Sequence, residues 1–156
     1  MKTKYSTDEK YMLEAIKQAR LAAKHGDVPI GAVIICDGKI IARGYNKREK
    51  EHNSILHAEI DAIQKACKTQ ANWRLTGAKI YVTIEPCPMC AGAILLSRIA
   101  EVYYGARDPK GGALGSSFNL FEQKHLNHHP KIVGGVLEIK CSQLLTTFFK
   151  ERRNKI

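Results

Sequence analysis

The sequence predicts one α/β domain, in which a sheet is layered against helices, over residues 1–156. Segments rich in β-branched residues alternate along the chain with segments whose apolar residues have helical spacing, which is typical of this class. The length of 156 residues is near that of one domain, and there is no internal repeat, low-complexity run or linker. A composition of 44% hydrophobic and 26% charged residues is that of an ordinary globular protein.

The first part of the chain is predicted to hold a helix and a β-hairpin. Ser6 and Glu9 have the spacing of a capping box, and the apolar positions that follow have helical spacing, so a helix is expected to begin there. Residues 30–36 form a short apolar run rich in β-branched side chains. An Asp-Gly pair after them is a hairpin-turn signal, and residues 39–45 are therefore expected to form the second strand.

Helices and strands continue to alternate in the rest of the chain. The expected elements are a helix over 58–66, a buried strand over 80–84, a buried helix over 90–96 and a short strand over 102–104. Residues 107–119 are rich in glycine and contain a proline, which favours a long, shaped loop. The last expected helix carries an apolar stripe formed by Cys141, Leu144, Leu145, Phe148 and Phe149.

Charge and cysteine content narrow the class of protein. There are 25 Lys and Arg against 15 Asp and Glu, and this net charge of +10 favours a polyanionic partner, nucleic acid first. The alternative is charge spread over the surface for solubility. The five cysteines are odd in number and no apolar signal segment follows Met1, so we expect reduced thiols or metal ligands in a cytoplasmic protein. The longest uncharged apolar stretch, 86–97, is shorter than the roughly 20 residues of a membrane span.

Two motifs carry candidate chemistry, His57-Ala58-Glu59 and Pro86-Cys87-Pro88-Met89-Cys90. Alone, Cys-x-x-Cys can be half of a zinc site, a redox pair or chance, and the other motif can be a core histidine beside a solvated glutamate. Together they offer one imidazole and two thiolates, whereas zinc takes four ligands. No well-placed fourth Cys or His is present, and an open position is typical of catalytic zinc. His57 and Glu59 can converge only if His57 lies where the chain enters a helix.

Both motifs match the His-x-Glu and Pro-Cys-x-x-Cys signature of zinc nucleobase deaminases. Over nearly its whole length the sequence resembles the tRNA adenosine deaminases, a branch of the zinc-dependent cytidine and deoxycytidylate deaminase superfamily. The stretches that select this branch are Asn72-Trp73-Arg74-Leu75, Gly105-Ala106-Arg107-Asp108, and Phe148-Phe149 with Arg152-Arg153. His129 departs from the pattern of the branch, in which we expect an arginine.

The resemblance implies a three-layer, cytidine-deaminase-like α/β fold, with a central mixed five-stranded sheet flanked by helices, in a single deaminase domain. It also implies a homodimer with one Zn²⁺ per subunit. The substrate would be the wobble adenosine of an arginine tRNA anticodon, converted to inosine. In this chemistry His57, Cys87 and Cys90 hold zinc, and Glu59 moves protons between water, the adenine ring and the leaving amine.

Contacts to the substrate are also implied by the resemblance. Asn46 would orient the nucleotide, and Asp108 would lie close to the extruded nucleotides, although the simpler alternatives are a turn residue and a loop cap. The pocket would be lined by Pro29, Ile30 and the Ala58 backbone N–H. At the C-terminus an aromatic side chain would stack on a base while cations neutralise phosphates. The residues expected to do so are Phe149, Arg152 and Arg153, which also fit a core stripe and the basic end of a helix.

Two other functions would use some of the same residues. A deaminase of a free base or nucleotide, of the guanine or cytidine type, would share the zinc site but would not need the +10 charge or the C-terminal arginines. A zinc-stabilised RNA-binding module without activity would want a fourth protein ligand and would not need Glu59. The sequence therefore favours the tRNA deaminase over both alternatives.

Overall fold

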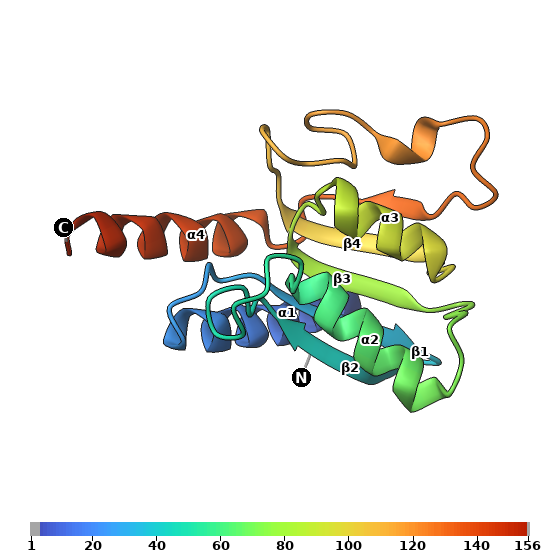
Figure 1. Ribbon diagram of the computed structural model, residues 1–156, viewed down its shortest axis with the longest axis horizontal. Helices are drawn as coiled ribbons and strands as arrows, with labels where there is room; N and C mark the ends of the chain where they lie inside the picture. Colours follow the sequence, from blue (N-terminus) through green and yellow to red (C-terminus); the bar gives the residue numbers. More distant parts are fainter. Residues whose placement is uncertain (1–3, 156) are drawn as a thin grey trace.

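The computed structural model describes residues 4–155. In chain order the elements are α1 (Thr7–Lys24), β1 (Gly31–Cys36), β2 (Lys39–Tyr45), α2 (Ala58–Gln70), β3 (Lys79–Ile84), α3 (Pro88–Leu96), β4 (Glu101–Ala106), the 3-10 helix η1 (Leu120–Glu122), β5 (Lys131–Val133) and α4 (Glu138–Arg153) (Figure 1). The predicted alternation of helices and strands is confirmed. Within the described residues, no helix combines the length and the apolar character that a membrane span requires.

The five strands form one mixed sheet in the order β2-β1-β3-β4-β5. β1 pairs antiparallel with β2 and with β3, whereas β3, β4 and β5 run parallel to one another. Between β1 and β2 the chain turns at Asp37 and Gly38, which both have positive φ, as a two-residue hairpin turn of type I′ requires. The expected fold class, a mixed five-stranded sheet flanked by helices, is confirmed.

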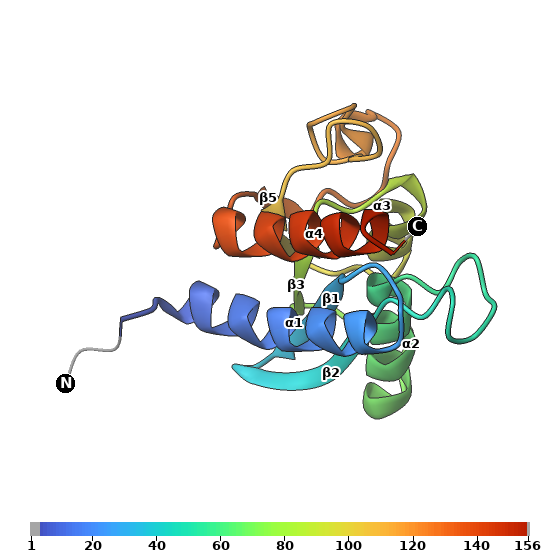
Figure 2. The same cartoon turned by 90° about the vertical axis from the view of Figure 1, so that its left-hand side faces the viewer.

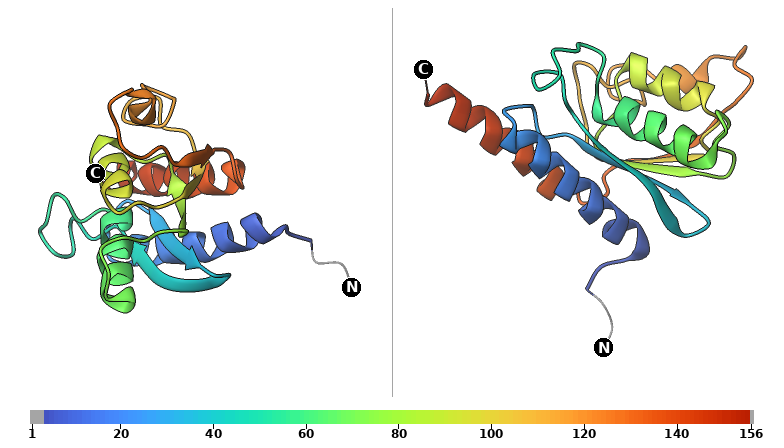
Figure 3. Two further views of the ribbon diagram at one scale, coloured as in Figure 1. Left: turned by 90° about the vertical axis from the view of Figure 1, so that its right-hand side faces the viewer. Right: turned by 60° about the horizontal axis from the view of Figure 1, so that its bottom comes forward.

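Helices cover both faces of the sheet (Figure 3). On one face, α1 and α4 pack over Val33 and Tyr81. On the other face, α2 and α3 pack over Ile34 and Ile80. Because successive side chains of a strand point to opposite faces, neighbouring residues of β1 and β3 contribute to the two cores in turn.

Two glycines allow the helices to approach the sheet closely. A Cβ atom at Gly31 would collide with the backbone of α1 at Ala15. A Cβ atom at Gly44 in β2 would lie 2.5 Å from Ala58 O and from Ala62 N in α2. A side chain at either position would push a helix away from the sheet. Gly44 thereby keeps the first turn of α2, which carries the His-Ala-Glu motif, against β2.

α4 lies alongside α1, and the two helices end at the same end of the molecule (Figures 1 and 2). The C-terminal half of α4 extends past the sheet. Cys141 near its start is buried, Leu144 and Leu145 are half-buried, and Phe149 is 44% exposed. Phe148 is half-buried like Leu144 and Leu145, so the predicted apolar stripe is fully covered only at Cys141. No sheet lies beneath the second half of α4.

Candidate zinc centre and active site

The side chains of His57, Cys87 and Cys90 converge where α2 and α3 begin. The Nδ1 atom of His57 lies 3.6 Å from Cys87 Sγ and 3.5 Å from Cys90 Sγ, and the three donor atoms lie within 4.8 Å of one another. A tetrahedral zinc ion, with Zn–S of about 2.3 Å and Zn–N of about 2.0 Å, separates a nitrogen from a sulfur ligand by about 3.5 Å. The donor types and their spacing fit zinc, with one position left open among the described residues.

Local sequence explains why these donors lie at helix starts. His57 is the N-cap of α2, with φ −71° and ψ 161°, so the expected position where the chain enters the helix is confirmed. Cys87 is the N-cap of α3, and Pro88 occupies the first helical position, where its missing N–H is not needed. The positive end of the α3 dipole favours the thiolate forms of both cysteines.

In the absence of a metal ion, the pKa of each of the three donors is shifted by at least one of the other two. The hydrogen bond from Cys90, together with the neighbouring His57, outweighs burial and lowers the pKa of the Cys87 thiol to about 4. The same hydrogen bond, helped by burial, raises the pKa of Cys90, and the hydrogen bond to Cys87 raises the pKa of His57. Zinc binding would replace these protons, because a coordinated thiol is deprotonated and a ligating imidazole is neutral.

Glu59 lies in the first turn of α2, beside the three donors, and is 2% exposed. Burial raises the pKa of its carboxyl group, and its side chain hydrogen-bonds with Cys90. A carboxyl group that lies beside the donors can accept a proton and return it, which is what general acid–base catalysis requires. The structure thus brings Glu59 beside the three candidate zinc donors, of which it is not one.

Asn46 follows β2 and is 3% exposed. Its Nδ2 donates to Val28 O at 3.2 Å, its Oδ1 accepts from Arg48 N–H at 3.3 Å, and its own N–H donates to Ile30 O at 3.0 Å. Asn46 therefore joins the loop before β1 to the loop after β2, which is the structural role of a turn residue. Its contact with a nucleotide stays a prediction.

The three residues expected to line the pocket are placed differently from one another. Ile30 is half-buried and packs against the core that contains the fully buried Ala58. Pro29 is buried and borders a hollow of about 280 Å³ between α1 and α4. Their contacts with a nucleotide also stay predictions.

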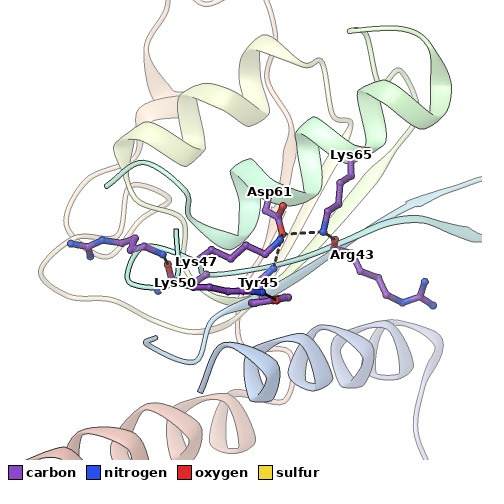
Figure 4. Close-up of polar contacts among 8 residues, drawn as sticks. Arg43, Tyr45, Lys47, Lys50, Asp61 and Lys65 are labelled. Carbon is purple, nitrogen blue, oxygen red and sulfur yellow. Dashed lines mark hydrogen bonds and ion pairs between the residues drawn. The ribbon is translucent and has the colours of Figure 1, made fainter. Parts of the chain in front are cut away.

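An ion-pair cluster around the buried Asp61, which the sequence did not indicate, fixes the chain on either side of Asn46 (Figure 4). Asp61 of α2 accepts a hydrogen bond from Tyr45 N–H at 3.2 Å and pairs with Lys47 at 2.9 Å and with Lys65 at 3.2 Å. Tyr45 and Lys47 flank Asn46, so one carboxylate holds the chain on both sides of it. The contacts of Asp61 with Tyr45 and Lys47 could not be predicted from the sequence, because Asp–Lys pairs at i,i+4, such as Asp61 and Lys65, are common on solvated helix faces.

Residues 107–119 form the expected shaped loop, and Asp108 is half-buried in it. Its Oδ1 accepts from Lys110 N–H and Gly111 N–H, both at 3.1 Å, so Asp108 caps the first turn of the loop. A contact of Asp108 with extruded nucleotides stays a prediction.

The 107–119 loop is also hydrogen-bonded to Glu85, a second buried carboxylate that could not be picked out from the sequence. Burial alone would raise the pKa of Glu85, but hydrogen bonds, led by those from Ser116, hold it below its usual value.

The C-terminal residues expected to hold RNA lie on the surface. Phe149 is 44% exposed, and Arg152 and Arg153 are exposed in the last turn of α4. Arg152 borders a hollow of about 170 Å³ together with Asn46 and Arg48. The fold therefore brings the end of α4 to the loop after β2, a connection that the sequence analysis did not make.

The chain is similar to known proteins in sequence and in fold. The family described as "Cytidine and deoxycytidylate deaminase zinc-binding region" matches residues 5–106. The tRNA-specific adenosine deaminase of Bacillus subtilis is 54% identical over 148 residues, which cover 95% of this chain and 92% of that protein. A solved structure from a study of A-to-I editing by tRNA:A34 deaminases at the wobble position of transfer RNA is 43% identical, with a TM-score of 0.84 over 87% of this chain and 99% of that one.

A guanine deaminase structure from Bacillus subtilis is 40% identical, with a TM-score of 0.62 over 64% of each chain. It matches a smaller part of the fold than the tRNA deaminase structure does. Sequence, fold and zinc-ligand geometry agree: the chain belongs to the cytidine and deoxycytidylate deaminase family, in the branch of the tRNA-specific adenosine deaminases.

Proposed function

We propose that this protein is a zinc-dependent enzyme that converts the wobble adenosine of a tRNA anticodon to inosine by hydrolysis. The observation that carries the proposal is the His57, Cys87 and Cys90 donor set with the buried Glu59 beside it. A structural zinc site would close with a fourth protein ligand, whereas this set leaves a position for water. The choice of adenosine in tRNA is supported by the 54% identity to the Bacillus subtilis tRNA-specific adenosine deaminase.

The reaction exchanges the C6 amino group of adenine for the oxygen of water. When bound, zinc supplies a water molecule that is activated near neutral pH. Glu59 would accept one proton from this water and pass it to ring nitrogen N1, and would then carry the remaining hydroxyl proton from C6 to the departing amine. Because Glu59 is buried, bulk water does not compete for these protons. Inosine and ammonia are the products.

The resemblance assigns further residues to the extruded base and its neighbours. Ile30, Pro29 and the Ala58 backbone would supply the apolar walls and one N–H donor, and Asn46 would supply a side-chain amide. Asp108 would lie against the neighbouring nucleotides. Extrusion from a single-stranded anticodon loop costs little, since the base has no partner to lose.

The RNA would be held at the end of the molecule where α1 and α4 stop. Arg48 in the loop after β2 and Arg152 at the end of α4 border one hollow, and Arg153 and Phe149 are exposed close by. Cations there would neutralise phosphates, and the exposed ring would stack on a base. The net charge of +10 supports a polyanionic substrate, and the resemblance narrows it to an arginine tRNA.

A homodimer with one zinc ion per subunit, working in the cytoplasm, is part of the same proposal. Trp73 and Leu96 are 55% and 69% exposed, and a second copy would cover such apolar side chains. Sedimentation at the mass of two chains would support the dimer, and sedimentation at the mass of one chain would refute it.

Ammonia release from four substrates tests the catalytic proposal. The substrates are an anticodon stem-loop with adenosine at the wobble position, free adenosine, free guanine and free cytidine. We expect release from the stem-loop far above release from the others. Release mainly from guanine would indicate the alternative favoured by the guanine deaminase match. No release from any substrate by the zinc-loaded protein would indicate a non-catalytic RNA-binding module.

A further inference from the structure

The buried carboxylate of Glu85 is not one of the zinc-centre residues, yet it lies two positions before Cys87. Glu85 is 2% exposed. Its oxygens accept hydrogen bonds from Asp108 N–H at 3.3 Å, from Leu114 N–H at 3.0 Å, from Ser116 N–H at 3.1 Å and from the Ser116 hydroxyl. All of these donors belong to the loop that follows β4. One carboxylate is therefore hydrogen-bonded to three residues of this loop, Asp108, Leu114 and Ser116.

The backbone of the loop is also packed against Glu85. Gly112 lies so close that a Cβ atom there would overlap the Glu85 carboxyl group. Beside it, Ala113 N–H donates to Pro86 O at 2.9 Å, in the residue that directly precedes the first cysteine ligand. The loop is thus joined to the zinc-ligand turn by side-chain and backbone contacts together.

Burial of a carboxylate costs free energy unless hydrogen bonds or a countercharge replace its water. Within residues 4–155, Glu85 is in none of the ion pairs. The loop donors therefore replace the water. Hydrogen bonds to a charged acceptor are short-ranged and directional, so they fix the position of the loop as well as stabilise it.

We propose that Glu85 is a positioning residue, which holds the 107–119 loop and its Asp108 against the zinc-ligand turn without touching the substrate. The proposal rests on the deaminase function proposed above and on the expected place of Asp108 near the extruded nucleotides. Asp108 is bonded to Glu85 through its own N–H, while its carboxylate caps the following turn. Without Glu85, the Asp108 side chain would lose its fixed position relative to Cys87.

The Glu85→Gln variant tests the proposal because it keeps the volume of the side chain but leaves one acceptor oxygen. In either orientation of the amide, its NH₂ group faces at least one backbone N–H of the loop, which then loses its acceptor. We expect the amide protons of Asp108, Leu114 and Ser116 to exchange at least about tenfold faster. Zinc content should be unchanged, and kcat/KM for the stem-loop should fall on the order of 10–100-fold.

Glu122→Gln is the matched control, because it makes the same change at an exposed position of η1. It should leave amide exchange, zinc content and kcat/KM at their wild-type values. If Glu85→Gln does not fold, Ser116→Ala replaces it, since this variant removes one hydroxyl donor of the loop and leaves β3 intact. Its effects should be smaller and in the same direction.

A double-mutant cycle with Asp108→Ala separates positioning from a general structural role. If Glu85 acts through Asp108, Glu85→Gln lowers kcat/KM much less in the Asp108→Ala background than in the wild type. Equal losses in both backgrounds would overturn the proposal, as would wild-type amide exchange in Glu85→Gln. If the wild-type protein does not deaminate the stem-loop, the proposed function fails, whereas amide exchange still decides whether Glu85 holds the loop.

Discussion

Replacing Arg152 and Arg153 together with alanine tests where the RNA is held. Both side chains are exposed in the last turn of α4, so the change removes two charges without opening a cavity. The half-buried apolar contacts of Leu144 and Leu145 remain in place. Surface substitutions usually change stability by less than about 0.5 kcal/mol, and the melting temperature should therefore barely move.

The size of the binding effect follows from counterion release. Each phosphate neutralised on a single strand contributes about 0.7 to the slope of log K against log salt, so losing two contacts should reduce the slope by about 1.4. Fluorescence anisotropy of a labelled anticodon stem-loop across a salt series measures this slope. Lys10→Ala with Lys68→Ala removes the same charge at exposed positions near the start of α1 and the end of α2, and should keep the wild-type slope. If Arg152 and Arg153 can be removed with affinity and slope unchanged, they form only a solvated helix end.

Three further changes test the zinc centre and its support. Glu59→Ala should keep zinc and fold but lose about 10²–10⁴-fold in turnover, and turnover within a few-fold of wild type would contradict its role in proton transfer. Cys87→Ala should lose most of its zinc in elemental analysis, because one of three protein ligands is gone, and full occupancy would refute the ligand set. Gly44→Ala should cost about 1–3 kcal/mol in urea unfolding, because its Cβ would lie 2.5 Å from the α2 backbone. Gly92→Ala, whose added Cβ meets nothing within 4 Å, is the control, and equal stability of the two variants would contradict close packing of α2 on β2.

Features with local signals were predictable from the sequence. The capping box of Ser6 and Glu9 forms with both of its reciprocal hydrogen bonds. The convergence of His57 with the two cysteines was predictable for the same reason, because an N-cap position and a Cys-x-x-Cys at a helix start restrict where the donors can point. The five-stranded sheet came from the resemblance, since β5 has three residues and no clear periodicity.

Features that depend on distant contacts left no local pattern. Glu85 looks like a carboxylate at a strand end, because its hydrogen-bond donors come 23 to 31 positions later. The spacing of apolar residues in α4 predicts an apolar face, but it does not say where the sheet beneath that face ends. For the same reason, the sequence did not show that Arg152 and Arg48 would border the same hollow. Arg48 follows β2 in the first third of the chain, whereas Arg152 lies at its end.

Reaction of the anticodon stem-loop in water enriched in heavy oxygen tests the central claim most directly. The account predicts that the wobble adenosine becomes inosine with heavy oxygen at C6, and that one ammonia is released for each base converted. Mass spectrometry of the digested RNA measures the label, and the Glu59→Ala variant should give almost none. Inosine without the label, conversion of another base in place of the wobble adenosine, or RNA recovered unchanged from the zinc-loaded protein would contradict the account.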